Sequence, residues 1–495
     1  MSVFDEHYDV VVVGAGNAAL SAALTALDRG ARVLVLERTP EGERGGNSRF
    51  TAGGMRFAYD GPDDIIELIP DLTEEEKATT DFGSYPESQF FDDLARITNY
   101  RADPDLAHLL VSKSREAVFW LRDHAGVRFL PSYRRFAFLH NGRHTFWGGV
   151  SVESSGGGPG LVESETTTFL NAGGQAAYDA RAVELLYDGG RVGGVRVQSS
   201  GSFHDVKAES VILAAGGFQA NLAWRTKYLG PGYDLARVRG TWANTGDGIR
   251  MALEIGAVPF GHWSGAHAVP WDLNAPEFGD LRVGDGFSKL SYPLGVMVNT
   301  NGERFIDEGA DFRTYTYAKY GHDVIRQPNQ AAWQIFDDKV TDMLRDEYHI
   351  QQATRVRADT LEGLVAKMDG VDGDRLSATL SEYNERVDEG TTYDPNVKDG
   401  KSSATMGLAK SNWATRLDTP PYTAFATTCG VTFTFGGLRI DENAQVLAAG
   451  RQPITGLYAA GELVGGIFYH NYPGGSGLTS GTVFGRIAGA TATAG

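Results

Sequence analysis

The first forty residues constrain the fold more than any other part of the chain. The apolar run 10–13 turns through Gly14 and Gly16 into Ala- and Leu-rich sequence of helical character, and a second apolar run, 33–36, ends at Glu37. This order is typical of a strand-turn-helix-strand unit that binds a dinucleotide. The glycines permit a tight turn and let backbone N–H groups approach a pyrophosphate at the helix N-terminus. We therefore predict an α/β fold built around a nucleotide-binding domain.

The residues that follow the two glycines refine this prediction. Ala19 replaces the third glycine of the motif, where helix and strand pack closely. Glu37 can accept hydrogen bonds from ribose hydroxyls, and its charge would repel a 2′-phosphate. We expect the nucleotide to contact a set of residues at this turn: Gly14, Gly16, Ala18, Ala19, Glu37 and Arg38. The alternative is an ordinary βαβ unit that binds nothing.

Length, charge and cysteine content limit what this unit can belong to. A chain of 495 residues predicts two or three domains. The formal charge of −18 argues against a nucleic-acid partner, so an anionic substrate would need a local cluster of Arg and His. The single cysteine, Cys429, excludes a disulfide framework or a thiolate iron–sulfur site within the chain. No apolar run reaches membrane-spanning length, and the short acidic stretch before residue 10 leaves no room for a signal peptide, which predicts a cytoplasmic protein.

Further clusters of small residues are candidate cofactor contacts. A glycine-rich loop covers 45–55, strands are expected at 181–186, 192–197 and 211–218, a helix follows 244–246, and another strand ends at 461–462. From these segments we expect contacts from Asn47, Ser48, Gly53, Gly54, Ala182, Val183, Ala215, Gly216, Gly217, Asp247, Gly461 and Glu462. Because such candidates occur in the first half and again in the last 40 residues, a domain is inserted between them.

Two stretches of the first half show no clear chemistry. The run 104–123 predicts a helix from its apolar spacing. Residues 129–160 mix aromatic and basic side chains with a glycine cluster at 156–160, which predicts either an irregular wall of the site or a solvated loop.

Taken in order, these motifs resemble the flavoprotein subunits of the fumarate reductase and succinate dehydrogenase superfamily, which includes ketosteroid dehydrogenases. The resemblance covers nearly the whole chain, from the opening fingerprint to the closing 461–489 segment. It implies FAD, a Rossmann-like FAD-binding domain over 1–268 and 418–495, and an inserted α+β capping domain over 269–417. Covalently flavinylated relatives carry a His where this chain has Asn47, so the resemblance implies non-covalent FAD.

Three segments, 261–267, 302–313 and 470–478, are most similar to tricarballylate dehydrogenases. The resemblance implies that Arg313 donates or accepts the proton, with a carboxylate partner such as Asp311 or Glu308, and that His267 holds a substrate carboxylate. Tyr472 or Tyr315 could replace Arg313 in that role. The alternatives are a structural ion pair of Arg313 with Asp307 or Asp311, a core histidine for His267, and a core aromatic for Tyr472.

Two departures from the family pattern bear on the substrate. Phe433 stands where fumarate reductases carry a carboxylate-binding His, and Tyr472 stands where they carry a clamping Arg. The Tyr-Pro-Gly pattern resembles that of ketosteroid dehydrogenases, whose Tyr polarises a ketone. Fumarate or succinate is therefore disfavoured. The three charges of a tricarboxylate would have to be balanced by His262, His267, Arg313, His470 and either Lys289 or Arg143. We expect the substrate to contact His262, His470, Phe433 and Gly475.

The resulting prediction is an FAD-dependent enzyme that desaturates a CH–CH bond next to a carboxylate or carbonyl, with tricarballylate-like polycarboxylates favoured. The hydride would go to flavin N5 and the proton to Arg313 or Tyr472. The helix expected at 476–490 would stabilise reduced flavin with its N-terminus, through Ser476, Gly477 and Leu478. One alternative is a ketosteroid-like dehydrogenase or enone reductase, suggested by Phe433, Phe435, Phe468 and Tyr469. Another is a flavin electron carrier with a degenerate substrate site.

No metal site is predicted. A separate electron acceptor is expected, either an iron–sulfur protein, quinone or oxygen, since no second dinucleotide fingerprint is visible.

Overall fold

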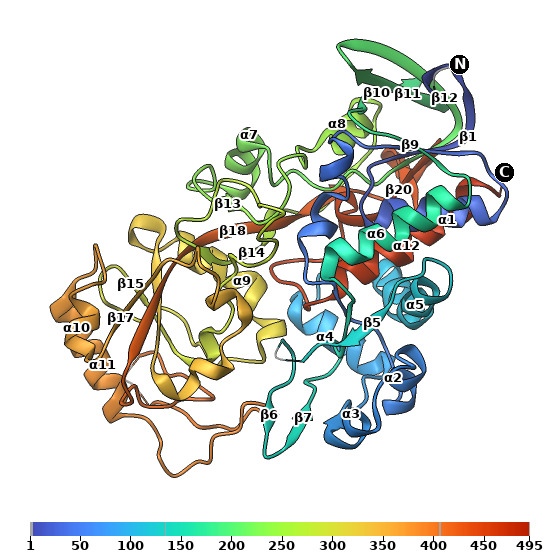
Figure 1. The fold of residues 1–495 in the computed structure, drawn as a ribbon. Helices are drawn as coiled ribbons and strands as arrows, with labels where there is room; N and C mark the ends of the chain where they lie inside the picture. The colour runs from blue at the N-terminus through green and yellow to red at the C-terminus, as the bar shows by residue number, and fades with distance from the viewer. Residues whose placement is uncertain (1–2, 134, 405–406, 495) are drawn as a thin grey trace.

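The computed structural model describes residues 3–133, 135–404 and 407–494. Two lobes lie side by side, and both chain termini belong to the same lobe (Figure 1). The long strands β14 (Pro259–Asp272) and β18 (Tyr422–Leu438) run between the lobes and pair with each other in antiparallel fashion. No helix in the described ranges combines the length and the apolar character needed to cross a membrane.

The lobe that contains the termini is organised around a mostly parallel sheet with the strand order β10-β11-β12-β1-β2-β9. Val10 to Val13 of β1 are buried because β1 lies between β2 and β12, which explains the unbroken apolar run. β20 joins the far edge of β12 in parallel, and β10 and β11 form an antiparallel extension. The strands are β1 (His7–Val13), β2 (Val33–Leu36), β9 (Gln175–Ala177), β10 (Arg181–Tyr187), β11 (Val192–Ser199), β12 (Ser202–Leu213), β19 (Gln445–Leu447) and β20 (Pro453–Ala459). The predicted α/β class is confirmed.

Helices α1 (Asn17–Asp28) and α12 (Ser476–Ala492) pack against each other beside this sheet, with α6 (Gly157–Asn171) next to α1 and α5 (Pro104–Asp123) next to α12 (Figure 1). A Cβ on Gly485 would lie 2.4 Å from the Ala18 carbonyl oxygen, and one on Gly489 would lie 2.3 Å from that of Ala22. The two helices are therefore in backbone contact at these glycines. The last helix of the chain thus rests directly on the first.

The other described elements of this lobe are short, and they are β3 (Gly54–Met55), α2 (Pro62–Leu68), α3 (Glu74–Thr79), β4 (Thr80–Asp81), α4 (Glu87–Ile97), β5 (Phe129–Pro131), β6 (Leu139–His140), β7 (Arg143–Thr145), β8 (Val152–Ser154), α7 (Leu222–Trp224) and α8 (Asp247–Glu254). Residues 129–160 are not irregular throughout. The glycine cluster 156–160 begins α6, where Gly158 leaves no space for a side chain next to the Ser48 carbonyl.

The second lobe holds a sheet in the order β13-β18-β16-β15, with β14 and β17 also paired to β18. Its elements are β13 (Arg237–Val238), β15 (Val296–Asn299), α9 (Tyr317–Ile325), β16 (Ala332–Phe336), β17 (Arg355–Ala358), α10 (Leu361–Val365) and α11 (Gly373–Glu385). The division expected at 268 falls inside β14, and the one at 418 lies just before β18. The ranges 1–268, 269–417 and 418–495 stay a prediction, with one sheet that continues through the first boundary.

Candidate functional site

A large cavity extends from the Gly14 turn to side chains of the second lobe. It encloses about 1790 Å³, including its open mouth. One end is lined by small residues of the nucleotide motif. The other is lined by aromatic rings and four arginines.

At the first end, the Gly14 turn is built as a dinucleotide motif requires. Gly14 has φ +112°, and a Cβ there would lie 2.3 Å from the Ala214 carbonyl oxygen. Glu37 lines the cavity after β2, and one carboxylate oxygen accepts hydrogen bonds from the Thr39 N–H (2.9 Å) and hydroxyl (3.0 Å). Burial raises the pKa of Glu37, although the Thr39 hydrogen bonds oppose the shift. Ala19 is fully buried in α1 and serves packing rather than the cavity wall.

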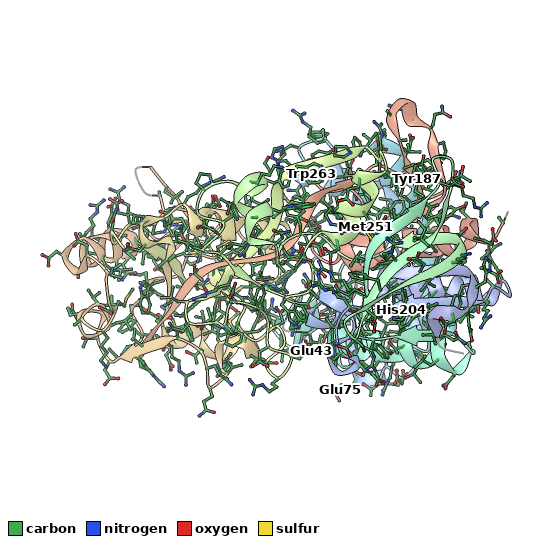
Figure 2. All side chains as sticks on the ribbon, turned by 90° about the horizontal axis from the view of Figure 1, so that it is seen from above. Glu43, Glu75, Tyr187, His204, Met251 and Trp263 are labelled. Carbon is green, nitrogen blue, oxygen red and sulfur yellow. The ribbon has the colours of Figure 1, made fainter. Side chains whose placement is uncertain are left out.

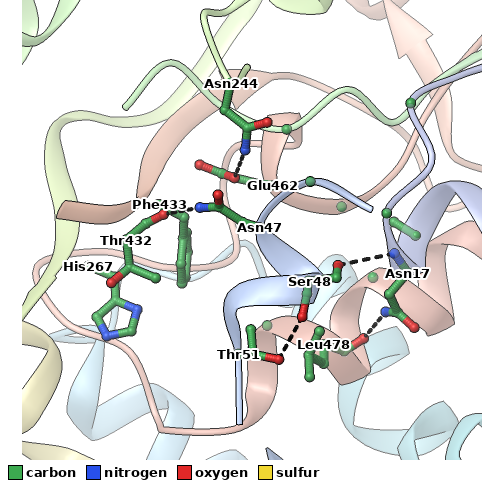
Figure 3. A pocket seen from close by; sticks show the side chains of 18 of the residues that line it. Asn17, Asn47, Ser48, Thr51, Asn244, His267, Thr432, Phe433, Glu462 and Leu478 are labelled. Carbon is green, nitrogen blue, oxygen red and sulfur yellow. Dashed lines mark hydrogen bonds between the residues drawn. The ribbon is translucent and has the colours of Figure 1, made fainter. Parts of the chain in front are cut away.

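The glycine-rich loop is fixed to three other segments (Figure 3). Asn47 donates its side-chain N–H to the Thr432 carbonyl and accepts a 2.9 Å hydrogen bond from the Thr241 N–H. The Ser48 hydroxyl accepts the Asn17 N–H (3.1 Å), and the Asn17 side chain donates to the Leu478 carbonyl (2.8 Å). The loop therefore ties the first helix to β18, and Asn17 of that helix binds α12 directly.

A second carboxylate, Glu462, lies deeper along the cavity. It accepts hydrogen bonds from the Thr434 N–H (2.9 Å), the Gln219 side chain (3.3 Å) and the Asn244 side chain (3.3 Å). Burial raises the pKa of Glu462 to about 7 despite these donors. This carboxyl group consequently keeps its proton to a higher pH than a glutamate in water.

Asp247 is held on the same side of the cavity by two arginines. The Arg181 guanidinium binds both of its oxygens (2.8 and 3.0 Å), and Arg38 donates a 3.1 Å hydrogen bond. These partners hold the pKa of Asp247 below its usual range, although burial opposes them.

At the far end, His267 lies among aromatic rings. Its ring is 4.8 Å from Tyr317, 4.9 Å from Tyr472 and 5.3 Å from Phe433, measured between centroids. Both imidazole nitrogens are buried without a hydrogen-bond partner in the described chain. Burial, with a smaller contribution from Arg239, lowers the pKa of His267 well below its usual range, so the ring is neutral at pH 7.

Tyr472 is also buried at this end, and its hydroxyl oxygen accepts a 2.9 Å hydrogen bond from the Gly475 N–H. Burial raises the pKa of the neighbouring Tyr317 well above its usual value, with a further contribution from Tyr472.

Four arginines and one acidic residue, Asp285, line this end of the cavity. Asp285 binds Arg239 at 2.7 Å and lies 3.8 Å from Arg135 and 4.0 Å from Arg345. Glu347, just outside the lining, pairs with Arg345 and with Arg135 (3.2 Å). Glu153 lies 3.4 Å from Arg135, so three carboxylates together neutralise three of the four guanidinium groups.

Arg313 is the fourth arginine, and it forms no ion pair within the described residues. It is buried, its Nη2 has no hydrogen-bond partner there, and its guanidinium lies 5.1 Å from the Phe136 ring centroid. Burial and the charge of Arg345 lower the pKa of Arg313 to about 9. A guanidinium with such a pKa can exchange a proton far more readily than one in water.

The carboxylate partners expected for Arg313 are wrong. Asp311 binds Arg96 (2.8 Å) and Lys398 (3.5 Å), and Glu308 pairs with Arg304. Asp307 accepts hydrogen bonds from the Ser411 and Gly309 N–H groups. The strand and turn geometry of 296–311 directs these acids toward other partners.

Several other residues considered for the reaction lie elsewhere. Tyr315 donates to Asp93 (2.6 Å) away from the cavity, Lys289 is fully buried 3.6 Å from Asp272, and Arg143 is exposed near Asp81.

His262 and His470 likewise do not line the cavity, so their expected contact with substrate is not supported by its geometry. They line a separate surface hollow. The register of β14 against β18 shifts between His262 and Ala266, which separates the environment of His262 from that of His267.

The structure brings together most of the other predicted site residues. The cavity is lined by Gly14, Gly16, Ala18, Glu37, Arg38, Asn47, Ser48, Gly54, Ala182, Ala215, Gly216, Asp247, Gly461, Glu462, Gly477 and Leu478, and at its far end by His267, Arg313, Phe433, Tyr472 and Gly475. The remaining predicted cofactor contacts, Ala19, Gly53, Val183, Gly217 and Ser476, do not line the cavity.

Sequence reasoning missed several residues of the lining: Asn17, Arg239, Asn244, Asp285, Tyr317 and Arg345. Arg135 and Phe136, which also line the cavity, belong to the segment 129–160, for which a wall of the site is one of the two interpretations given above. Asn17 directly follows Gly16, and Asn244 begins the segment 244–246 before a predicted helix, so both positions carried a usable signal. The arginines come from separate segments, and nothing local marks them as neighbours.

The residues present fit FAD. The Gly14 and Gly16 turn offers close backbone approach, Glu37 follows β2 where a ribose hydroxyl would be bound, and the cavity continues to the start of α12. The Ser476 hydroxyl, in the first turn of α12, is buried without a partner in the described chain. Gly477 and Leu478 of the same turn line the cavity, so a bound group can approach this helix end.

Comparison with known proteins agrees with this geometry. The family model described as an FAD binding domain matches residues 9–478. The chain belongs to this FAD-binding family. It is 31% identical over 488 residues to the fumarate reductase (cytochrome) of Shewanella frigidimarina, covering 97% of this chain and 76% of the relative. It is 27% identical to the 3-oxosteroid 1-dehydrogenase of Mycolicibacterium smegmatis, covering 98% of this chain and 96% of the relative.

The fold agrees as well. The open conformation of a flavocytochrome c3 fumarate reductase superimposes with a TM-score of 0.72 at 28% identity, covering 99% of this chain and 78% of that one. This flavoprotein is thus a member of the fumarate reductase and succinate dehydrogenase superfamily, and an FAD-dependent oxidoreductase that acts on CH–CH groups.

Proposed function

We propose that this flavoprotein interconverts a CH–CH bond and a C=C bond next to a single carboxylate or a ketone carbonyl. The observation that carries the proposal is Arg313, a buried guanidinium without a carboxylate partner in the described chain, at the aromatic end of the cavity. One uncompensated cation matches one anionic group, or one carbonyl oxygen that gains negative charge during the reaction.

The tricarballylate-like substrate expected from the sequence is less well supported than a substrate with a single carboxylate or a ketone carbonyl. Three substrate carboxylates would meet four arginines, but Asp285, Glu347 and Glu153 already neutralise three of them. Phe136, Phe433 and Phe468 supply apolar lining instead of further cations. Burying extra unpaired carboxylates beside these rings would cost several kcal/mol, on the order of the penalty for an unpaired buried ion.

Each of these side chains has its own role in the proposed reaction. His267, which is neutral, and the O–H of Tyr472 donate hydrogen bonds to the substrate oxygen, whose charge grows as a hydride reaches or leaves the β-carbon. Arg313 holds or removes the proton of the α-carbon, since its lowered pKa permits exchange. FAD, when bound, supplies hydride acceptance and donation. The aromatic rings exclude water from this end.

An enone reductase or ketosteroid-like dehydrogenase is the second candidate, because the same aromatic lining would cover an apolar ring. Tyr472 would then polarise the ketone.

The proposal also includes a separate electron carrier and a cytoplasmic location. FAD is attached non-covalently, because the glycine-rich loop carries Asn47 rather than His.

The test is an anaerobic half-reaction. The holoenzyme is reduced with dithionite and mixed with cinnamate, with aconitate as the tricarboxylate, or with a 3-ketosteroid that carries a Δ1 double bond. Return of the oxidised flavin band with cinnamate or the steroid, and not with aconitate, is expected. Reoxidation by aconitate alone would overturn the proposal in favour of a polycarboxylate.

The same measurement tests the electron-carrier alternative. In the variants Arg313→Ala and Tyr472→Phe, the rate of reoxidation by the unsaturated compound should fall while reduction by dithionite stays normal. If none of the three compounds reoxidises the wild type, the substrate site is degenerate and the electron-carrier function is favoured.

A further inference from the structure

The hollow that contains His262 and His470 lies on the outer surface and has no role in the proposed chemistry. Six side chains that line it are Arg101, Lys227, Tyr228, His262, Tyr469 and His470. Trp263 also lines it and lies near the edge of the molecule in Figure 2. Because the hollow is open, a ligand there would stay in contact with solvent.

The charge of this hollow is opposite to that of the whole chain. The formal net charge is −18, yet Arg101 and Lys227 are exposed in the hollow and neither forms an ion pair with a described carboxylate. No described residue of its lining is acidic. A basic patch on an acidic protein attracts an acidic partner and orients its approach.

Its backbone is irregular on two sides. Lys227 and Tyr228 belong to a π-helical turn, Arg225–Leu229, and His470 has φ +60°. The His470 N–H donates a 3.0 Å hydrogen bond to Nδ1 of His262, which fixes the His262 ring. π-turns and left-handed non-glycine residues are costly, and they occur frequently at functional sites.

Only a thin aromatic wall separates the hollow from the FAD cavity. The His262 ring is stacked 6.5 Å from the ring centroid of Phe435, and Phe435 lines the cavity. Phe468, which also lines the cavity, directly precedes Tyr469 in the hollow. The rate of electron transfer falls steeply with distance. A redox group bound in this hollow would therefore be close enough to exchange electrons with a flavin in the cavity.

We propose that this hollow is the docking site of an acidic one-electron carrier protein that exchanges electrons with the bound FAD. The inference rests on the proposed function for its overall reaction: R–CH=CH–R′ + 2 e⁻ + 2 H⁺ → R–CH₂–CH₂–R′. Two carrier molecules each deliver one electron and are oxidised, the protons come from solvent through the site, and the alkene is reduced. The opposite direction returns one electron to each of two oxidised carriers.

The experiment uses the oxidised holoenzyme with an acidic [2Fe–2S] ferredoxin as probe and the basic cytochrome c as its counterpart. Calorimetry at low ionic strength measures binding, and anaerobic stopped-flow measures flavin reduction by reduced ferredoxin. Zero-length carbodiimide coupling followed by peptide mapping should join Lys227 to a ferredoxin carboxylate.

The decisive variant reverses two charges, Arg101→Glu with Lys227→Glu. Affinity for ferredoxin and the second-order rate of flavin reduction should both fall at least about tenfold, and salt should weaken the wild-type interaction. The matched control, Lys207→Glu with Arg355→Glu, makes the same charge change at exposed positions outside the hollow and should alter both by less than about twofold. Lys227→Ala is a milder second variant in case the double reversal does not fold.

Three results would overturn the proposal: no ferredoxin binding to the wild type at low ionic strength, equal effects of the decisive and control variants, or binding of inorganic pyrophosphate without binding of ferredoxin. The last would identify a small-anion site. Reoxidation by cinnamate is measured separately in each variant. Its failure in the wild type, with ferredoxin docking intact, would remove the proposed substrate and leave the docking site standing.

Discussion

The imidazole of His267 lies 4.9 Å from the ring of Tyr472, and both of its nitrogens are buried without a hydrogen-bond partner in the described residues. Leaving buried polar atoms unpaired costs free energy, so the arrangement favours a ligand that supplies the partner. Tyr472 lines the same cavity. The pair thus defines where a substrate oxygen is expected.

Replacing His267 by Phe should keep the ring packing and remove the hydrogen-bond donor. We expect kcat/KM to fall by about 10²–10³, the usual effect of losing a donor to a developing oxyanion. The rate of reoxidation of the reduced enzyme by the unsaturated substrate checks this. His262→Phe is the matched control and should leave this rate unchanged, because His262 lies outside the cavity.

Arg313 should control the pH dependence, with a pKa of about 9. Reduction of the C=C bond needs the protonated guanidinium, so its rate should fall as pH rises above about 9. Dehydrogenation needs the neutral form, so its rate should rise with pH up to about 9. Stopped-flow half-reactions in both directions measure the two profiles.

In the variant Arg313→Ala, the reaction rate should fall by a factor of about 10²–10⁴. The changes in rate with pH near 9 should also disappear in both directions of the reaction. An unchanged profile in this variant would assign the titration to another group.

Glu462 should make the apo protein less stable as pH rises. Its folded pKa of about 7 lies above the ordinary value, so between about pH 4.5 and 7 the folded state binds more protons than the unfolded state, and the free energy of unfolding falls with increasing pH. The loss is on the order of 1–3 kcal/mol. Urea unfolding across this range measures it, and Glu462→Gln should flatten the slope. An identical slope in both proteins would exclude Glu462 as its source.

Gly485→Ala should destabilise the α1–α12 contact. The added Cβ would lie 2.4 Å from the Ala18 carbonyl oxygen, so the helices must separate, at a cost of about 1–3 kcal/mol. Thermal unfolding and FAD content measure the effect. Gly193→Ala adds the same atom where nothing lies within 4 Å and should not lower the Tm.

Denaturation should release FAD. Asn47 has no ring nitrogen to form a flavin linkage, and its amide is occupied by Thr432 and Thr241. Acid precipitation should leave a yellow supernatant and a colourless pellet. Flavin that stays with the precipitated polypeptide would show a covalent bond elsewhere.

The parts of the site that sequence predicted well are those fixed by local backbone geometry. Gly14, Gly16 and Glu37 lie within one βαβ unit, whose strand spacing and turn dictate their positions. The helix at 104–123 followed from its apolar spacing, and α5 covers the same residues.

The parts that could not be predicted depend on which segments meet in space. Arg135, Arg239 and Arg345 come from three distant segments and converge on Asp285. Nothing near Arg313 in the sequence shows that its adjacent acids turn toward other partners. The β14 register shift likewise separates two histidines that a motif comparison treats together.

The contact between α1 and α12 also has a consequence for biosynthesis. Asn17, in the first turn of α1, donates to the Leu478 carbonyl of α12. During synthesis, more than 450 residues therefore follow the nucleotide-binding turn before α12, which forms the opposite wall of the cavity, has been made. FAD can be enclosed only after the last helix has been made, so premature termination would yield a polypeptide whose dinucleotide motif is present but whose cofactor site stays open.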